Sequence, residues 1–271
     1  MLNRSRREFS LRDSWPIPLS EIVDFIAYIF KNGFAHSTVN CYISGLSFKN
    51  KLHNFEDNTD AFIVRKMLDG IKRCSLNKSD SRLPIIRELL GNILLVLPAI
   101  CKSSFESCLF KSAFSLCYHG MFRVSELTCS GSMNHAMKVT NVRNCDDGLE
   151  IFLQRSKTDQ YGTGVTIHLA PQGDKQLCPV QALNVFLKFR PKIDGILFCH
   201  FDGRPLTKYQ SSSMLKRSLS VLGMSHSKLS SHSFRIGMAT QCTMDGYPDE
   251  QVMRLGRWRS NVYLRYIRIP N

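Results

Sequence analysis

The sequence predicts a mainly α-helical protein with a small β-sheet, and three observations support this fold class. Apolar residues recur at helical spacing between residues 18 and 73, a β-type pattern replaces it between residues 149 and 169, and helical spacing returns after residue 179. The chain has 271 residues, of which 43% are hydrophobic. This length and composition are sufficient for a buried core in one large or two small domains.

The N-terminal part is predicted to be a small all-α unit of three amphipathic helices. The first is expected between Pro18 and Gly33, the second begins at Ser37 as its N-cap, and the third extends from about residue 60 to Ile71. A linker is expected at 73–83, where RCSLNKSDSRL is polar and aperiodic and precedes a proline. The chain therefore divides near residue 80, into domains 1–80 and 83–271.

The second domain is predicted to contain helices on both sides of a β-hairpin. The hairpin strands are expected at 149–157 and 164–169, because both segments are rich in β-branched and aromatic residues and a turn-prone segment joins them. Helical spacing or a short apolar run predicts the other elements, which are helices near 86–97 and 103–121, a short helix in FRVSEL, a helix at 179–189, a strand at 195–200, helices near 207–222, 232–245 and 248–256, and a final helical segment at 262–267.

The charge of the chain points to a polyanionic partner. Lys and Arg number 36 against 22 Asp and Glu, which gives a formal net charge of +14. We expect no membrane partner, because no segment approaches the ~20 consecutive apolar residues of a bilayer span. The N-terminus is basic without an apolar core behind it, so secretion is not expected.

The cysteines and the sequence motifs predict neither a metal nor a cofactor. The ten cysteines are spread along a chain too large to need disulfides, so free thiols in a reducing compartment are expected. Cys101, Cys108, Cys117 and His119 lie close together, but their spacing matches no zinc-ligand pattern. The chain also lacks a P-loop, GxGxxG and HExxH, the usual motifs of nucleotide hydrolysis, dinucleotide binding and zinc proteolysis.

Four segments instead carry a dispersed set of cations and aromatic residues. They are FRVSEL with Arg123, QRSKTDQ with Lys157, HSFR with His232 and Arg235, and LGRWRSNVYLRYIR with Trp258 and Tyr266. In this order they resemble the signature of the tyrosine recombinase (phage integrase) family, and the last segment is most like the recombinases of eukaryotic mobile elements. The resemblance covers most of the chain. It implies a helical core-binding (SAM-like) domain and a mixed α/β catalytic domain that close around double-stranded DNA.

The resemblance also implies a role for each of these residues. Tyr266 would be the nucleophile that forms a covalent 3′-phosphotyrosyl link, and Lys157 would protonate the leaving 5′ oxygen. A transition state with charge on its phosphate oxygens favours fixed donors, and Arg offers a permanently charged fork. The phosphate-binding set would be Arg123, His232, Arg235 and Trp258, with Glu126 supporting Arg123; His232 is also a candidate acceptor of the tyrosine proton. Such a reaction needs no metal or ATP.

Several alternatives stay open at this stage. Tyr263, three residues before Tyr266, is a rival nucleophile, and Arg123 with Glu126 also fits a plain surface ion pair. The same basic surface suits a DNA-binding relative without catalytic activity, or a relaxing enzyme similar to type IB topoisomerases. The family implies a homo-oligomer, a tetramer on DNA, but only IRIPN follows Tyr266, and the N-terminal domain is expected to be one helix short, as in a truncated or minimal domain. The expected location is the nucleus in a eukaryotic host and the cytoplasm otherwise.

Overall fold

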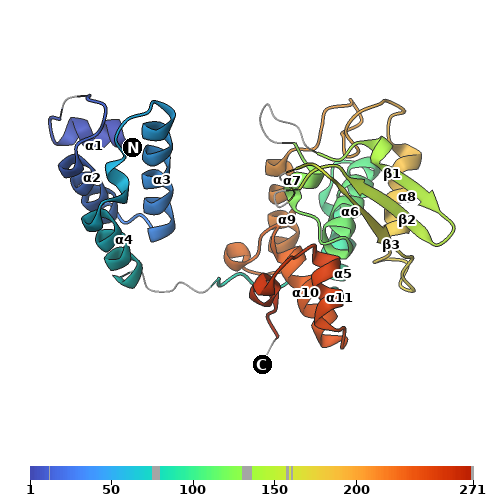
Figure 1. The fold of residues 1–271 in the computed structure, drawn as a ribbon. Helices are drawn as coiled ribbons and strands as arrows, with labels where there is room; N and C mark the ends of the chain where they lie inside the picture. The colour runs from blue at the N-terminus through green and yellow to red at the C-terminus, as the bar shows by residue number, and fades with distance from the viewer. Residues whose placement is uncertain (12, 75–79, 130–135, 157–158, 160, 270–271) are drawn as a thin grey trace. The chain divides into compact units, whose positions relative to one another are not determined.

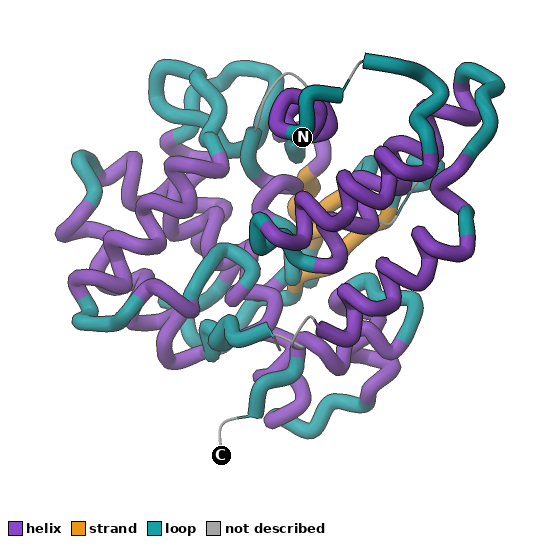
Figure 2. The backbone as a smooth tube through the Cα atoms, turned by 90° about the vertical axis from the view of Figure 1, so that its left-hand side faces the viewer, coloured by secondary structure: helices purple, strands orange, loops and turns teal. Residues whose placement is uncertain are grey.

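The chain forms two compact units in the computed structural model. It describes residues 1–271 except 12, 75–79, 130–135, 157–158, 160 and 270–271. The N-terminal unit is Met1–Ser79 and the C-terminal unit is Asp80–Asn271 (Figure 1). Most of the described backbone is helix, and its strands belong to one small sheet (Figure 2), so the predicted fold class is confirmed.

In the part that the structure describes, the N-terminal unit contains four α-helices around one apolar core. They are α1 (Leu2–Glu8), α2 (Leu19–Lys31), α3 (His36–Leu52) and α4 (Phe62–Cys74), with a 3-10 helix at Asn58–Asp60. The three longer helices lie close to the predicted positions, because their apolar stripes bury Ile22, Phe25, Val39 and Val64. The predicted start of α3 is wrong: Ala35 is the N-cap, and Ser37 lies inside the helix.

Helix α1 was not predicted, because ion pairs hold it in place of an apolar stripe. Its sequence, LNRSRRE, has no apolar stripe, and Arg6 is only 4% exposed. The Arg6 guanidinium donates to the carboxylates of Glu21 and Asp13 and to the carbonyl of Ser14. A buried guanidinium requires such partners, and they fix α1 against the start of α2.

The C-terminal unit places seven α-helices and a three-stranded antiparallel sheet around one large core, among the residues that the structure describes. The sheet has the order β1-β2-β3, and Val142 pairs with Ile151 while Ile151 pairs with Ile167. The bounds of the elements are α5 (Arg87–Ile100), α6 (Ser104–His119), α7 (Val124–Leu127), β1 (Val142–Cys145), β2 (Gly148–Leu153), β3 (Val165–Leu169), α8 (Pro179–Phe189), α9 (Lys208–Val221), α10 (Ser233–Met244) and α11 (Asp249–Gly256), with 3-10 helices at Val139–Asn141, His226–Lys228 and Asn261–Tyr266.

The sheet differs from the predicted hairpin in three ways. Strand β1 was not predicted, since its sequence VRNC is short and polar. Strand β2 ends at Leu153, so it does not extend to Lys157, which lies outside the described residues. The segment 195–200 is no strand and has only isolated bridges: the amide of Leu197 donates to the carbonyl of Met137, while the side chain of Arg190 donates to the carbonyls of Ile196 and Leu197.

The extended segment before α5 lies directly on α10. The amide of Leu83 donates to the carbonyl of Lys228 at 2.8 Å, and that of Ile85 donates to the carbonyl of Ser233 at 3.0 Å. A Cβ at Gly237 of α10 would lie 1.7 Å from the carbonyl oxygen of Ile85. The end of the predicted linker is therefore packed within the C-terminal unit, next to the start of α10.

This contact predicts that Gly237→Ala lowers the free energy of unfolding of the C-terminal unit by about 3 kcal/mol, because two backbone segments must separate. The matched control is Gly91→Ala in α5, where a new Cβ would meet only Leu177 at 3.7 Å. We expect that control to gain about 0.5–1 kcal/mol through helix propensity. Urea unfolding is followed by Trp258 fluorescence in a Trp15→Phe background; equal stabilities for the two variants would contradict the prediction.

Candidate active site

Arg123 and Glu126 form an ion pair at the start of α7. Arg123 is the N-cap residue; its amide donates to Oε2 of Glu126 at 2.9 Å, and its Nη1 donates to Oε1 at 3.0 Å. The Glu126 side chain is buried, 5% exposed, whereas that of Arg123 is 18% exposed. The carboxylate thus fixes a partly exposed guanidinium, so the ion-pair interpretation and a role for Arg123 in a site are compatible.

Arg235 is a fully buried cation in the first turn of α10. It donates through Nη1 to the carbonyl of Met121 and through Nη2 to the carbonyl of Gly256, the latter at 3.0 Å. Its Nε has no hydrogen-bond partner among the described residues. Burial, together with the nearby charges of Arg257 and Arg123, lowers its pKa from 12.5 to about 10, so it still carries its charge at neutral pH.

Tyr266 lies among the side chains of His232, Trp258 and Arg235. It is the last residue of the 3-10 helix Asn261–Tyr266. Its ring centre lies 4.7 Å from that of Trp258 and 5.0 Å from that of His232. The Cζ atom of Arg235 lies 5.6 Å from the Tyr266 ring and 5.0 Å from the Trp258 ring. Residues more than thirty positions apart in sequence are therefore brought to one place.

A cavity of about 470 Å³ joins these groups. Five of the six predicted catalytic residues line it, while Lys157 lies outside the described part of the chain. Glu126 does not line the cavity, but its carboxylate accepts a hydrogen bond from Arg123, which does. The full lining is Arg82, Arg123, Val124, Lys208, Ser230, Ser231, His232, Arg235, Trp258, Val262 and Tyr266. The cavity is thus strongly cationic and contains one phenol and one imidazole.

Two cations of the cavity were not predicted. Lys208 begins α9, and Arg82 belongs to the expected linker. Arg82 makes two hydrogen bonds to Asp80, each 2.8 Å long, and they lower the pKa of that carboxyl to about 2. Asp80 also pairs with Arg268 at 3.6 Å. The polar, aperiodic sequence around Arg82 carries no signal of this role, because its place depends on the backbone pairing with the segment before α10.

Tyr263 faces a different environment from Tyr266. Tyr263 is buried, only 3% exposed. It packs with Met121 and Val252 and does not line the cavity. A hydrogen bond to Asp249 raises its pKa. A buried, hydrogen-bonded phenol away from the cations is a poor nucleophile, so the geometry favours Tyr266.

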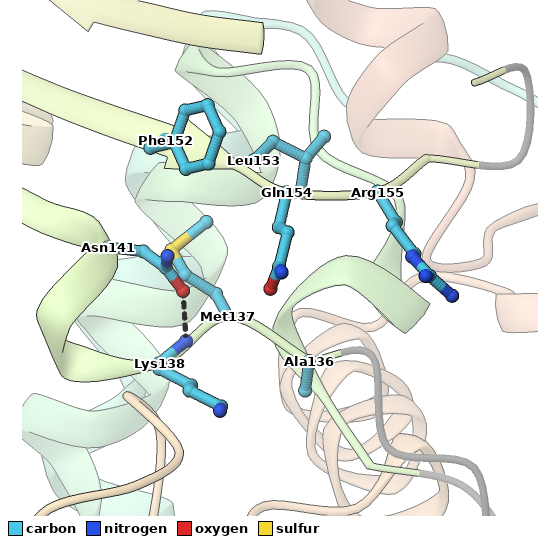
Figure 3. Close-up of a pocket in the computed structure, with 8 residues that line it drawn as sticks. All are labelled: Ala136, Met137, Lys138, Asn141, Phe152, Leu153, Gln154 and Arg155. Carbon is cyan, nitrogen blue, oxygen red and sulfur yellow. Dashed lines mark hydrogen bonds between the residues drawn. The ribbon is translucent and has the colours of Figure 1, made fainter. Parts of the chain in front are cut away.

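A second, smaller hollow of about 230 Å³ lies where β2 ends (Figure 3). The side chain of Gln154 extends there toward the segment of Met137 and Lys138, and the amide of Lys138 donates to Oδ1 of Asn141 at 2.8 Å. Arg155 completes a lining with two cations and no carboxylate.

The described residues offer no metal site and no membrane span. Within them, no group of three or more His, Cys, Asp or Glu side chains could hold a metal ion. Burial raises the pKa of the Cys101 thiol to about 11 and that of Cys117 to about 12, in keeping with packing roles. No helix in the described part of the chain is long and apolar enough to cross a bilayer.

The chain belongs to the phage integrase family, because the family model matches residues 92–268, more than half of it. An integrase/recombinase xerD homolog from Selenomonas ruminantium is 26% identical over 223 residues, which cover 77% of this chain and 60% of the relative. The chain thus spans less than two thirds of the length of that curated relative.

Solved structures share the fold at low sequence identity. XerH site-specific recombinase bound to palindromic difH substrate, in a post-cleavage complex, matches with a TM-score of 0.68 and 17% identity over 98% of this chain and 74% of the other. A lambda integrase tetramer bound to a Holliday junction matches with a TM-score of 0.65 and 16% identity over 98% and 70%. The likeness of fold extends over both units of this chain.

The environment of His232 predicts a neutral imidazole at physiological pH. Burial, followed by the charges of Arg82 and Arg235, lowers its pKa from 6.5 to about 4. The unfolded chain therefore binds a proton here between pH 6.5 and 4 while the folded chain does not, and the free energy of unfolding falls as the pH falls through this window. In His232→Gln this contribution is absent.

The measurement is a proton NMR titration, in which the His232 resonance is assigned by its loss in His232→Gln. We expect a midpoint near the lowered value of about 4. A midpoint close to 6.5 would show that the imidazole is solvated like a free histidine.

Proposed function

We propose that this chain is a site-specific DNA recombinase or integrase that cuts and rejoins double-stranded DNA through a covalent 3′-phosphotyrosyl intermediate. The observation that carries the proposal is the approach of Tyr266 to the cations of a single cavity, with its ring 5.6 Å from Cζ of the buried Arg235. An unpartnered donor on a buried guanidinium favours an anionic ligand. Family membership points to the same chemistry.

In this proposal the scissile phosphate binds between Arg123 and Arg235. Their guanidiniums donate to the non-bridging oxygens and stabilise the charge that these oxygens gain in the transition state. The indole N–H of Trp258, which lines the cavity, supplies a further donor. His232, neutral through its lowered pKa, accepts the proton of the Tyr266 hydroxyl.

The covalent step then balances without a metal or ATP. The Tyr266 oxygen forms a bond to phosphorus while the bond from phosphorus to the 5′ oxygen breaks. Lys157 protonates that leaving oxygen; its role rests on the resemblance, since it lies outside the described residues. Attack by a 5′ hydroxyl on the phosphotyrosine reverses the step, because a phenolate leaves more readily than an alkoxide.

Duplex DNA is the proposed partner of both units. The net charge of +14 suits a polyanion, and the N-terminal helices would be the DNA core-binding domain, at 1–80, ahead of a catalytic domain at 83–271. XerH and lambda integrase are DNA-bound in the matched structures, the latter as a tetramer. We propose a homo-oligomer here, a tetramer on DNA, in the nucleus or, in a host without one, the cytoplasm. Kinship with eukaryotic mobile elements stays a prediction.

The proposal predicts that Tyr266→Phe abolishes the covalent complex with a suicide DNA substrate. Tyr263→Phe is the matched control: it loses the hydrogen bond to Asp249 and keeps the adduct. Adducts are counted on denaturing gels as protein linked to labelled DNA.

Other outcomes separate the alternatives. An unchanged adduct in Tyr266→Phe would refute the assignment. Salt-sensitive DNA binding without any adduct would identify a relative that binds DNA but does not cut it. Relaxation of supercoiled plasmid without sequence preference would indicate an activity similar to that of type IB topoisomerases.

A further inference from the structure

Arg257 adopts a backbone conformation that residues with a Cβ rarely adopt. It follows α11 with φ of 58° and ψ of 41°, in the left-handed region. Its side chain is nevertheless 9% exposed and turned inward. Its Nη1 donates to the carbonyl of Gly120 at 2.9 Å, and its Nη2 donates to the carbonyl of Met121 at 3.0 Å. Buried hydrogen bonds of this kind offset the cost of the backbone conformation.

The same guanidinium connects to both candidate phosphate-binding arginines through one shared group each. Its Nη2 also donates to Oε2 of Glu126 at 3.1 Å, and the other oxygen of Glu126 accepts from Arg123. The Met121 carbonyl that accepts from Arg257 accepts from Arg235 as well. Arg257 is thus the middle member of a chain of hydrogen bonds that runs from the guanidinium of Arg123 to that of Arg235.

The residues on either side of Arg257 extend this chain of contacts to the nucleophile. Gly256, immediately before it, accepts a hydrogen bond from Arg235, and Trp258, immediately after it, packs on Tyr266. A Cβ on Gly256 would lie 1.8 Å from the Trp258 ring, so the indole folds back directly over that residue. The left-handed turn at Arg257 produces this reversal.

We propose that Arg257 is a positioning residue that sets the relative geometry of Arg123, Arg235 and the Trp258–Tyr266 pair. The inference rests on the function proposed above and adds a residue to it that the sequence analysis did not assign to the site and that does not line the cavity. Arg257 acts through Glu126 and Met121 and does not contact the phosphate. A planar fork can serve two carbonyls and a carboxylate at fixed angles, whereas a lysine ammonium keeps only the charge.

The first test is single-turnover cleavage of a saturating suicide substrate by Arg257→Lys. We expect the cleavage rate to fall about a hundredfold, the cost of misplacing reacting groups by roughly an ångström. DNA affinity should change far less, because many phosphate contacts outside the cavity hold the duplex. Arg254→Lys is the matched control, because Arg254 is an exposed cation on α11. All proteins are assayed well below their melting temperatures, so a loss of rate does not reflect unfolding.

The second test does not depend on cleavage. Inorganic phosphate is titrated into the protein in a Trp15→Phe background, where Trp258 is the remaining tryptophan and reports from the cavity. We expect Arg257→Lys to weaken phosphate binding and Arg254→Lys to leave it unchanged.

The two tests separate the two claims. A wild-type protein that binds phosphate but forms no adduct refutes the proposed function, and the titration then still decides the role of Arg257. Wild-type behaviour of Arg257→Lys in both tests overturns the inference. A fall in cleavage rate or phosphate binding that is fully explained by a smaller fraction of folded protein also overturns it. A wild-type protein that neither binds phosphate nor cleaves DNA overturns both claims.

Discussion

The site depends on one buried carboxylate. Glu126 is 4% exposed and contacts two guanidiniums, those of Arg123 and Arg257. An unpaired carboxylate in this place would be strongly unfavourable, and so would two neighbouring cations without it. The carboxylate and the two guanidiniums therefore stabilise one another, and folding as well as the proposed reaction depends on their arrangement. The C-terminal unit is built so that several chain reversals meet at this point.

Those reversals come from segments far apart in sequence. The chain turns after α6 at Gly120 and Met121, begins α7 at Arg123, and returns from α11 at Arg257. Met121 itself has a positive φ of 45°, so two residues with unfavourable backbone conformations hydrogen-bond to one another. Strain of this kind persists where surrounding contacts over-determine it, and it concentrates at functional sites.

Periodicity alone predicted the elements that bury an apolar face. The helices α2, α5 and α8 lie close to their predicted positions, because each carries a stripe facing a core. Periodicity failed where contacts of charged side chains determine the local structure. Ion pairs of Arg6 hold α1, and the Arg190 side chain binds two carbonyls of the predicted strand at 195–200. These contacts form only in the folded chain and leave no apolar periodicity in the sequence, so the pattern of apolar residues does not reveal them.

In the candidate site, too, some residues could be predicted from the sequence and others could not. Residue types in a known order predicted Arg123, His232, Arg235, Trp258 and Tyr266, which the fold brings to one cavity. Arg82 and Arg257 have no such signal, since their partners come from tertiary contacts: Arg82 depends on the pairing of Leu83 with Lys228, and Arg257 on two carbonyls after α6. The candidate general acid Lys157 remains a matter of sequence alone.

The carbonyl acceptors of Arg235 have an evolutionary consequence. Met121 and Gly256 offer main-chain oxygens, which every amino acid possesses, so substitution at these positions does not delete the acceptor. Selection then acts on the path of the backbone and on room for it, as at Gly256, more than on side-chain identity. A site whose acceptors are peptide groups is therefore less sensitive to side-chain changes than one whose acceptors are side chains.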